Sequence, residues 1–317
     1  MRKGQNPAKF IQQVAKPEKV TVAVLNYIPF LSGFYEKMPE VLNLCLSSLW
    51  ENTDVPYDLM VFDNGSCQEV KDYLVHAAGQ GKIQYLILSE KNLGKGGAWN
   101  IIFDAAPGEV IAYTDNDAYF YPGWLSKSLE ILEAFPKVGM VTSRPFRTPE
   151  KYSSHTIEWA SATPEVTLER GQFLSWEVFR DFVMSLGNSE EQAREWFETG
   201  EGDMRVTYRG VCAHVGASHW QFVSRKAVLK EFLPFDMTRP MGQVRMLDER
   251  INAAGYLRLM TSEPLAQNMS NEPSLKPEAA SESQNGSSPL KQRVANIPFV
   301  KNSLLAVYNA IFKLYYS

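Results

Sequence analysis

The sequence predicts an α/β fold, a mainly parallel sheet with helices on both faces, and two observations carry the prediction. Short apolar runs of strand length alternate with stretches whose apolar residues recur at three- and four-residue spacing, as on one face of a helix. Parallel strands need helical crossovers, and the order strand, loop, helix repeats from Val20 onward. Ligands of such sheets bind beyond the carboxyl ends of the strands, so the polar residues after each strand form the candidate site.

The first half of the chain has the clearest pattern. Its predicted strands are the apolar runs at 20–25, 59–62, 83–88 and 110–114. Its predicted helices lie between them, at 38–50, 70–78 and 98–105. The helix that starts at Met38 is the best defined, because its apolar side chains up to Trp50 share one face.

The stretch from Arg147 to Val215 is expected to be less regular than the first half. It is rich in aromatic residues that lie near charged ones. Its two predicted helices lie at 176–186 and 190–198. A strand at 219–224 and helices at 226–232 and 244–254 are expected after it, and Gly255 is a typical residue to end the last helix.

Three end segments differ from this pattern. Residues 1–19 form a basic N-terminal extension with a net charge of +4. Residues 272–292 are rich in Ser, Pro, Glu, Gln and Asn, which predicts a disordered linker. Residues 293–317 are expected to form a basic amphipathic helix that contacts a membrane peripherally, the alternative being a helix that docks on its own domain or on a partner.

Composition excludes several classes of protein. Lys and Arg number 32 against 36 Asp and Glu, a formal charge of −4 that argues against a nucleic-acid-binding protein. The three cysteines are far apart, which argues against a zinc knuckle or a disulfide framework and favours a reducing, cytoplasmic compartment. The sequence has neither the ~18 consecutive apolar residues of a membrane span nor the apolar core of a secretory signal.

Polar turns follow three of the predicted strands. The sequence Asp-Asn-Gly-Ser follows the second strand at 63–66, and Asp115-Asn116-Asp117 follows the fourth. Two carboxylates so close together repel each other unless a cation such as Mg²⁺ or Mn²⁺ binds them. The alternative is a turn rich in Asp and Asn that has no ligand.

A glycine-rich loop at 92–100 follows the third strand. Glycines let backbone amides approach a phosphate or a sugar closely. The loop lacks the Gly-Lys-Ser/Thr ending of a P-loop and the spacing of a dinucleotide-binding motif. The alternative is a flexible connection that close packing requires.

Together these segments resemble, in order and spacing, the nucleotide-binding half of family 2 glycosyltransferases, whose Rossmann-like fold is called GT-A. The resemblance covers residues 20–142 and implies a nucleotide-sugar-binding half at 20–145 and an acceptor half at 146–271. In the family the first Asp of the 63–66 turn hydrogen-bonds the nucleobase. The resemblance implies a donor site made of Asn26, Asp63, Asn92, Gly94, Lys95, Asn100, Asp115 and Asn116. It implies a Mn²⁺ or Mg²⁺ site made of Asp115, Asp117 and Asn268.

The second half resembles the family more loosely. Residues 250–256 are similar to its Arg-Leu-x-x-Ala-Gly-Tyr stretch, but the Glu-Asp pair that usually precedes this Arg and supplies the base is replaced by Gln243 and Val244. Asp248 is therefore the candidate base, with Glu249 as the second choice. The alternative for both is an exposed helix face paired with nearby arginines.

Three further positions leave alternatives open. Lys95 is a candidate phosphate contact, the alternative being a solvated loop lysine. Asn268 stands where the family often has a His that binds the metal, and Trp99 where it often has Arg. Either His214 or His219 is a candidate for the acceptor site, the alternative being a structural histidine.

The resemblance implies an inverting, hexosyltransferase-type enzyme that moves a sugar from a UDP-, GDP- or dTDP-sugar to a glycan or a lipid-linked acceptor, as in polysaccharide biosynthesis. One alternative is a non-catalytic relative that binds nucleotides or glycans. Another is a sugar-phosphate nucleotidyltransferase, which needs a glycine-rich basic loop that residues 26–33 do not offer.

Overall fold

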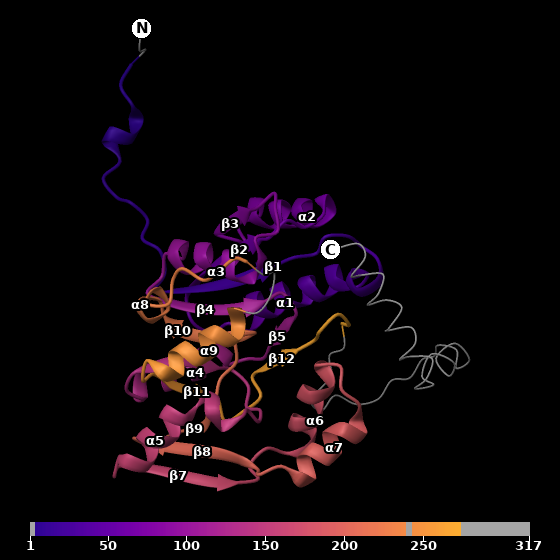
Figure 1. Ribbon diagram of the computed structural model, residues 1–317. Coiled ribbons are helices and arrows are strands. Elements are labelled where there is room, and N and C mark those ends of the chain that lie inside the picture. Colours follow the sequence, from indigo (N-terminus) through magenta and orange to yellow (C-terminus); the bar gives the residue numbers. More distant parts are fainter. Residues whose placement is uncertain (1–3, 239–242, 274–317) are drawn as a thin grey trace, which may run out of the picture. The chain divides into compact units, whose positions relative to one another are not determined.

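The computed structural model describes residues 4–238 and 243–273 (Figure 1). These residues form a ten-stranded sheet in the order β3-β2-β1-β4-β10-β6-β11-β9-β8-β7, and a two-stranded sheet of β12 and β5. The predicted linker from residue 274 onward and the predicted tail helix at 293–317 lie outside the described residues. In the parts of the chain that are described, no helix is both long and apolar enough to cross a membrane.

The strands are β1 Val20–Asn26, β2 Tyr57–Asp63, β3 Tyr85–Leu88, β4 Val110–Asp115, β5 Ala118–Phe120, β6 Val138–Thr142, β7 Val166–Gly171, β8 Asp203–Tyr208, β9 Val211–Val215, β10 Gln221–Arg225, β11 Leu257–Met260 and β12 Ala266–Asn268. The α-helices are α1 Met38–Asn52, α2 Gln68–Gly79, α3 Gly94–Ala105, α4 Trp124–Ala134, α5 Ser154–Ala162, α6 Trp176–Ser185, α7 Glu190–Thr199, α8 Lys226–Lys230 and α9 Gln243–Ala253. Short 3₁₀ helices lie at Pro7–Phe10, Gly33–Tyr35 and Glu150–Tyr152.

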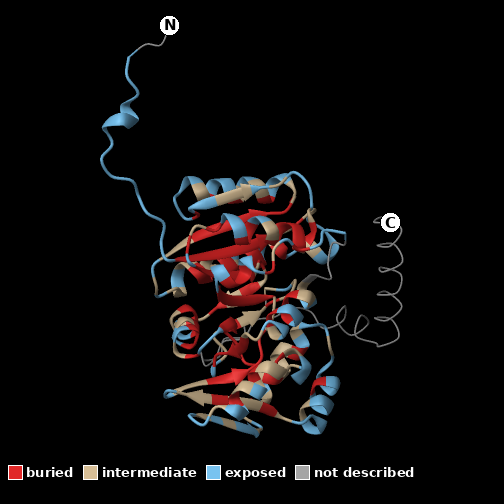
Figure 2. Ribbon diagram, turned by 60° about the vertical axis from the view of Figure 1, so that its left-hand side comes forward, coloured by how far each residue is buried: buried red, intermediate tan, exposed pale blue. Residues whose placement is uncertain are grey.

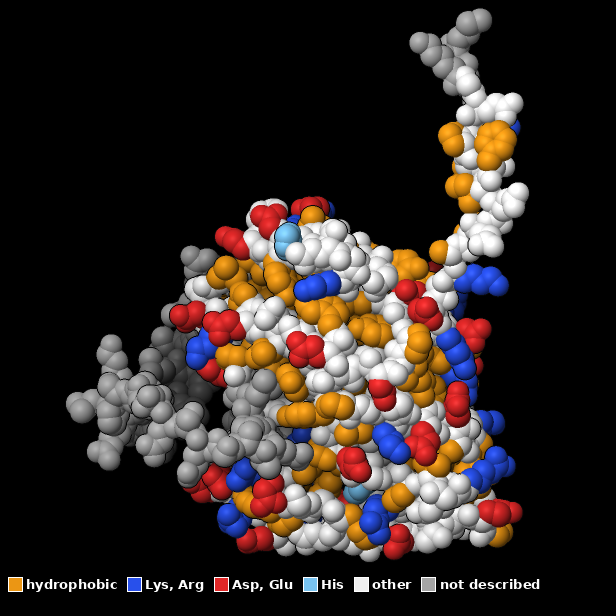
Figure 3. All heavy atoms as spheres, turned by 180° about the vertical axis from the view of Figure 1, so that it is seen from behind, with side chains coloured by type: hydrophobic (Ala, Val, Ile, Leu, Met, Phe, Trp, Pro, Cys, Tyr) orange, Lys and Arg blue, Asp and Glu red, His pale blue; other side chains and the backbone are white. Residues whose placement is uncertain are grey.

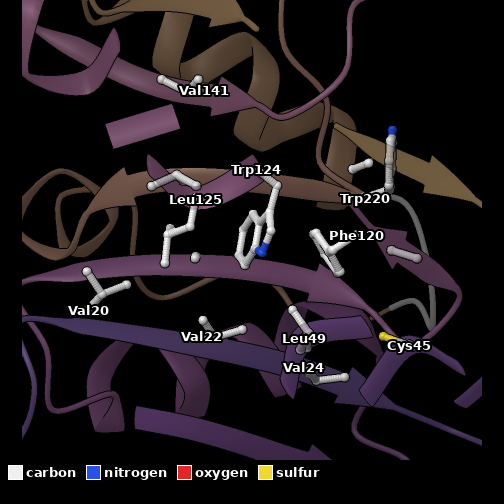
Figure 4. Close-up of a cluster of buried hydrophobic side chains, with 14 of the residues drawn as sticks. Val20, Val22, Val24, Cys45, Leu49, Phe120, Trp124, Leu125, Val141 and Trp220 are labelled. Atoms are coloured by element: carbon white, nitrogen blue, oxygen red, sulfur yellow. The ribbon is translucent and has the colours of Figure 1, made fainter. Parts of the chain in front are cut away.

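Helices cover both faces of the sheet, which confirms the predicted fold class. Val22 and Val24 of β1 point into a core that also contains residues of α1, α2 and α4. Ala23 and Leu25 point into a second core, with α3, α8 and α9. A strand buried on both faces carries few polar residues, which is why residues 20–25 are apolar except for Thr21. Figure 2 shows the buried sheet between its exposed helices, and Figure 4 shows Val20, Val22 and Val24 in the core with Leu49 and Trp124.

The two halves of the predicted domain share one sheet. Strands β3, β2, β1 and β4 are parallel, while β10 is antiparallel to both β4 and β6. Strand β6 therefore runs parallel to β4, and β11 is parallel to β6. The amino end of β10 consequently lies beside the carboxyl end of β4, where the candidate site is expected.

The acceptor half is more regular than the sequence predicts. Both helices expected at 176–186 and 190–198 are present as α6 and α7. However, β7, β8 and β9 form an antiparallel meander within the stretch that was expected to be irregular. Its strands contain charged and half-exposed residues, so they lack the apolar runs of the first half.

Residues 94–97 are not a loop, because they form the first turn of α3. Gly97 is needed for packing there, since a Cβ at this position would lie 2.8 Å from both Leu93 Cβ and Met237 Cε. Both the expected loop and the alternative of a flexible connection are therefore wrong for residues 94–97, although close packing does require Gly97.

The N-terminal extension makes few contacts. Residues 4–19 are exposed, and Phe10, Ile11 and Val14 expose 70%, 67% and 86% of their surface. Figure 3 shows apolar side chains on this extension with little around them. The backbone N–H of Glu18 donates to Asp58 Oδ2, close to where β1 begins.

Candidate active site

Asn26 joins the carboxyl ends of three strands. Its Nδ2 donates to Asp63 Oδ1 at 2.7 Å and to Ser66 Oγ at 3.0 Å. Its Oδ1 accepts a hydrogen bond from Asn116 Nδ2 at 2.6 Å. Asn26 and Asp63 are completely buried and Asn116 is 8% exposed. The ends of β1, β2 and β4 are thus tied together by polar side chains, three of which the sequence assigns to the donor site.

Ser66 completes this cluster from the turn after β2. Its Oγ accepts a hydrogen bond from the backbone N–H of Ile28, and its own N–H donates to Asp63 Oδ2 at 3.0 Å. Both carboxylate oxygens of Asp63 therefore have partners inside the protein. The sequence places Ser66 in the polar turn but does not reveal its role, because its partners come from a different strand.

The loops after β2 and β3 are held together by Asn64 and Asn92. Asn64 Nδ2 donates to Asn92 Oδ1 at 3.0 Å, and Asn64 Oδ1 accepts from the N–H of Leu93. Asn92 Oδ1 also accepts from the N–H of Gly94. Gly65 has φ +92°, and a Cβ there would lie 3.1 Å from the backbone nitrogen of Asn92. The two loops approach closely here, and the positive φ together with the tight Cβ contact favours glycine at position 65.

Lys95 forms an ion pair with Asp115 rather than standing in solvent. The Nζ of Lys95 lies 2.6 Å from Asp115 Oδ2, and its side chain is 12% exposed. The ammonium also lies 5.5 Å from the ring centre of Trp99. Tyr113 Oη donates to the other oxygen, Asp115 Oδ1, at 2.6 Å, and burial together with Asp115 raises the pKa of this phenol. The alternative of a solvated loop lysine is therefore wrong.

Asp117 has a buried carboxylate oxygen without a partner. Its Oδ1 is shielded from solvent and makes no hydrogen bond with any residue that the structure describes. Burial, followed by the negative charge of Asp115, raises the pKa of Asp117 to about 7, while Lys95 opposes this shift. A bound divalent cation would supply the missing partner, so the residues present fit the predicted metal.

Asn268 lies where the third metal ligand is expected. It faces Ala118 across the β12–β5 pair, and the next residue, Met269, donates its N–H to the carbonyl of Asp117 at 2.7 Å. The Oδ1 of Asn268 accepts from the N–H of Ser270. Across the described ranges, no three His, Cys, Asp or Glu side chains gather into a metal site. Asp115, Asp117 and Asn268 therefore remain the candidate ligands, two carboxylates and one amide.

Asp248 is buried and has two partners, so the alternative interpretation, that it lies on an exposed helix face, is wrong. Its Oδ1 accepts from Arg258 Nη2 at 2.6 Å, and its Oδ2 lies 2.8 Å from His219 Nδ1. Arg258 is 1% exposed, and burial lowers its pKa while Asp248 raises it. Glu249, the second choice for the base, is exposed.

His219 connects Asp248 to the turn after β4. Trp220, the next residue, accepts a hydrogen bond at its carbonyl from the N–H of Asp115 at 2.9 Å. His219 precedes Trp220 in the turn that leads into β10, so its backbone lies close to the end of β4. The other candidate, His214, is buried 3.5 Å from Asp203, and burial lowers its pKa to about 4. His214 fits the structural alternative, and His219 lies at the site.

Asn100 does not join the donor cluster through a hydrogen bond. Its Nδ2 donates to the carbonyl of Phe235 and its Oδ1 accepts from the N–H of the same residue. These bonds attach α3 to the segment before α9. The remaining predicted residues, from Asn26 to Asn116 and on to Asn268, meet at one edge of the sheet.

Known proteins similar to this chain match part of its length. Residues 33–195 match the family described as glycosyl transferase family 2. An uncharacterized glycosyltransferase of Nostoc sp. is 26% identical over 39% of this chain and 35% of its own length. The succinoglycan biosynthesis protein ExoW of Rhizobium meliloti is 26% identical over 32% of this chain and 33% of its own length. The chain thus spans about a third of the length of the curated relatives that it matches.

Solved structures show a more distant likeness. S. aureus TarS in complex with UDP-GlcNAc has 14% identity and a TM-score of 0.47, over 78% of this chain and 57% of that one. A mannosyltransferase from Pyrobaculum calidifontis, in complex with GDP-Man and Mn²⁺, has 18% identity and a TM-score of 0.46, over 79% and 55%. At such identities and scores the likeness says nothing about the substrate of this chain.

Proposed function

The chain belongs to glycosyltransferase family 2, and from this premise we propose that it transfers a sugar from a nucleotide-diphospho-sugar to an acceptor hydroxyl with the help of Mn²⁺ or Mg²⁺. The observation that carries the proposal is the convergence on Asn26. This residue links Asp63, the candidate nucleobase contact, to Asn116, the centre of the candidate metal turn. A nucleotide and a cation bound at these two places lie at the same sheet edge, as one donor molecule requires.

The proposed donor site has a base end and a phosphate end. Asp63 lies at the base end, and the loop of Asn92 and Gly94 lines the space next to it. Asp115 and Asp117 lie at the phosphate end, where the orphaned Oδ1 of Asp117 supports a role in holding the cation. When bound, the cation supplies Lewis-acid stabilisation of the charge that develops on the leaving diphosphate. Lys95 is close enough to Asp115 to turn its ammonium toward the same phosphates.

The transfer that we propose is a single in-line displacement with inversion at the anomeric carbon. The acceptor hydroxyl loses its proton to a base of the chain as it attacks, and the nucleoside diphosphate departs from the opposite face. The acceptor half, with α6 and α7 next to β12, is proposed to bind a glycan or a lipid-linked acceptor. Arg144 connects these elements by donating to the carbonyls of Ala266 and Val178.

Membrane contact through residues 293–317 stays a proposal of its own, because it rests on the sequence of that segment. Co-sedimentation of the full chain with liposomes, compared with a chain that ends at Asn271, tests it. Equal pelleting of the two chains contradicts the proposal.

Release of nucleoside diphosphate from a panel of UDP-, GDP- and dTDP-sugars, with and without Mn²⁺, tests the proposed function. We expect one nucleotide class to be turned over in a cation-dependent way, even with water as the acceptor. Asp117→Asn is expected to abolish the cation dependence, whereas Asp72→Asn, an exposed site on α2, is a matched control. The replacement of the family's Glu-Asp pair by Gln243 and Val244 favours a non-catalytic relative as second candidate, and cation-dependent binding without turnover is the result that identifies it.

A further inference from the structure

We propose that His219 takes the proton from the acceptor hydroxyl and that Asp248 is a positioning residue that orients its ring. The inference rests on the proposed glycosyl transfer. It replaces the expectation that Asp248 is itself the base, and it explains how the chain works without the Glu-Asp pair.

Asp248 is poorly placed to accept a proton from a substrate. Both of its oxygens have partners within the protein, Arg258 Nη2 at 2.6 Å and His219 Nδ1 at 2.8 Å. Its side chain is 11% exposed, and the guanidinium next to it stabilises the negative charge that a base must give up on protonation. A substrate hydroxyl would compete with Arg258 for Oδ1 and with His219 for Oδ2.

His219 is better placed, because it bonds Asp248 and lies next to the residue that contacts the end of β4. Its side chain is 32% exposed, and the carbonyl of the following residue, Trp220, accepts a hydrogen bond from the N–H of Asp115. The hydrogen bond to Asp248 takes the Nδ1–H, so the lone pair of the neutral ring is on Nε2. Within the described ranges, no residue forms a hydrogen bond with Nε2.

The carboxylate that orients the ring is itself held rigidly. Arg258 donates to Asp248 and also to the carbonyls of Ala217 and Tyr152, so it is fixed from three sides. Leu247, next to Asp248 on α9, is completely buried in the core. A base that is fixed in this way loses little entropy when the substrate binds.

The position of Asp248 accounts for the altered motif. It lies one helical turn after Val244, further from the start of α9 than the family's Glu-Asp pair. A carboxylate at this position along α9 needs a second side chain to reach the acceptor. The imidazole of His219 provides it. As in a catalytic triad, a carboxylate orients a histidine that acts as general base. Here the base acts on the hydroxyl of the bound acceptor and not on a side chain of the protein.

In the proposed transfer, the acceptor O–H bond breaks and its proton moves to Nε2 of His219. The ring becomes an imidazolium that Asp248 stabilises. The acceptor oxygen bonds to the anomeric carbon, and the bond from that carbon to the diphosphate oxygen breaks with its electron pair. The nucleoside diphosphate leaves, and the imidazolium returns its proton to water.

Turnover of the donor by matched variants tests the inference. We expect His219→Asn and His219→Gly to slow the release of nucleoside diphosphate by about 10²–10⁴-fold, the usual contribution of a general base, with unchanged affinity for nucleoside diphosphate and Mn²⁺. Added imidazole should restore part of the rate of His219→Gly, which a purely structural role would not allow. His76→Gln, on the exposed face of α2, is the matched control and keeps the parent rate.

The tautomer of His219 is a second readout that needs no turnover. The chain has four histidines, so the ring nitrogens can be assigned in two-bond ¹H–¹⁵N spectra by comparison with His219→Asn. At a pH where the ring is neutral, we expect the proton on Nδ1. Asp248→Asn should abolish the preference for the proton on Nδ1 and slow turnover. Because this variant leaves Arg258 without its carboxylate partner, its thermal unfolding is measured as well.

The outcomes separate the inference from the proposed function. A parent enzyme that releases no nucleoside diphosphate from any donor contradicts the proposed function, and the inference falls with it. A parent that turns over its donor while His219→Asn matches its rate contradicts the inference alone. A proton on Nε2, or no response of His219→Gly to imidazole, also overturns it.

Discussion

The ammonium of Lys95 lies 2.6 Å from Asp115 Oδ2, so a cation of the chain itself neutralises the first carboxylate of the proposed metal turn. The two side chains are 12% and 24% exposed, and solvent therefore screens the pair only in part. A divalent cation that binds Asp115 and Asp117 has to displace this ammonium or share the carboxylate with it. Lys95 thus stabilises the protein in the absence of a cation, and we expect it to compete with a metal that binds at this turn.

Replacement of Lys95 by Met tests this competition. The variant keeps the apolar stem beside Trp99 but leaves the two aspartates without a counter-charge. We expect its free energy of unfolding in EDTA to fall by about 1–2 kcal/mol, and its affinity for Mn²⁺ to rise, as measured by the electron paramagnetic resonance of free Mn²⁺. Lys91→Met, at an exposed position, is the control. Weaker Mn²⁺ binding in Lys95→Met than in the control would show that Lys95 does not compete.

The pKa of Asp117 predicts how stability depends on pH without a cation. This pKa is about 7 in the folded protein and 3.8 in the unfolded chain, so between these values the folded state binds more protons. Stability in EDTA should therefore fall as pH rises from about 4 to 7, by a few kcal/mol in total. Urea titrations across this range measure it. Asp117→Asn should flatten the profile, and an unchanged slope in this variant would assign the titration to another group.

Loss of the Asn26 side chain should weaken both the fold and the site. Asn26→Ala leaves Asp63 Oδ1 and Asn116 Nδ2 buried without this partner, and each such loss costs about 1–3 kcal/mol. We expect a lower free energy of unfolding in urea and weaker binding of nucleoside diphosphate. Asn43→Ala removes an exposed amide that bonds Tyr73 and should change stability by less than about 0.5 kcal/mol. Equal effects of the two variants would argue against a linking role for Asn26.

Gly65 offers a test of the contact between the two donor loops. Gly65→Ala suffers from a positive φ and from a Cβ only 3.1 Å from the backbone of Asn92. Gly187 has a similar φ of +87° with nothing within 4 Å of a Cβ, so Gly187→Ala carries the backbone strain alone. We expect both variants to lose about 1 kcal/mol of stability, and only Gly65→Ala to bind nucleoside diphosphate more weakly. Calorimetric titration with nucleoside diphosphate measures this affinity. An unchanged affinity in Gly65→Ala would show that the Asn92 loop is not part of the donor site.

Strands β1 and β4 could be predicted because they are buried on both faces. Residues 20–25 and 110–114 are apolar except for one Thr each, and polar turns follow them, so the pattern gives both the strands and the site edge. Strands β7 and β8 were missed because a half-exposed antiparallel strand alternates polar and apolar residues only weakly. Such strands are recognised only through their partners.

The residues of the candidate site could be predicted better than their contacts. Asp115, Asn116 and Asp63 follow strands, so their types and positions were enough to find them. The pairing of Asp248 with Arg258 and His219 joins α9 to β11 and to the segment before β10, and no local pattern reveals it. The same holds for Asn100, whose amide bonds a backbone segment 135 residues away.

Binding of nucleoside diphosphate, titrated calorimetrically with and without Mn²⁺, tests most directly whether the edge around Asn26, Asp63 and Asp117 is a nucleotide-sugar site. We predict that one of UDP, GDP and dTDP binds once per chain, that binding requires the cation, and that Asp117→Asn weakens it at least about tenfold, equivalent to about 1.4 kcal/mol. Asp72→Asn should bind like the parent. Binding of none of the three, or an affinity of Asp117→Asn equal to that of the parent in the presence of Mn²⁺, would contradict the account.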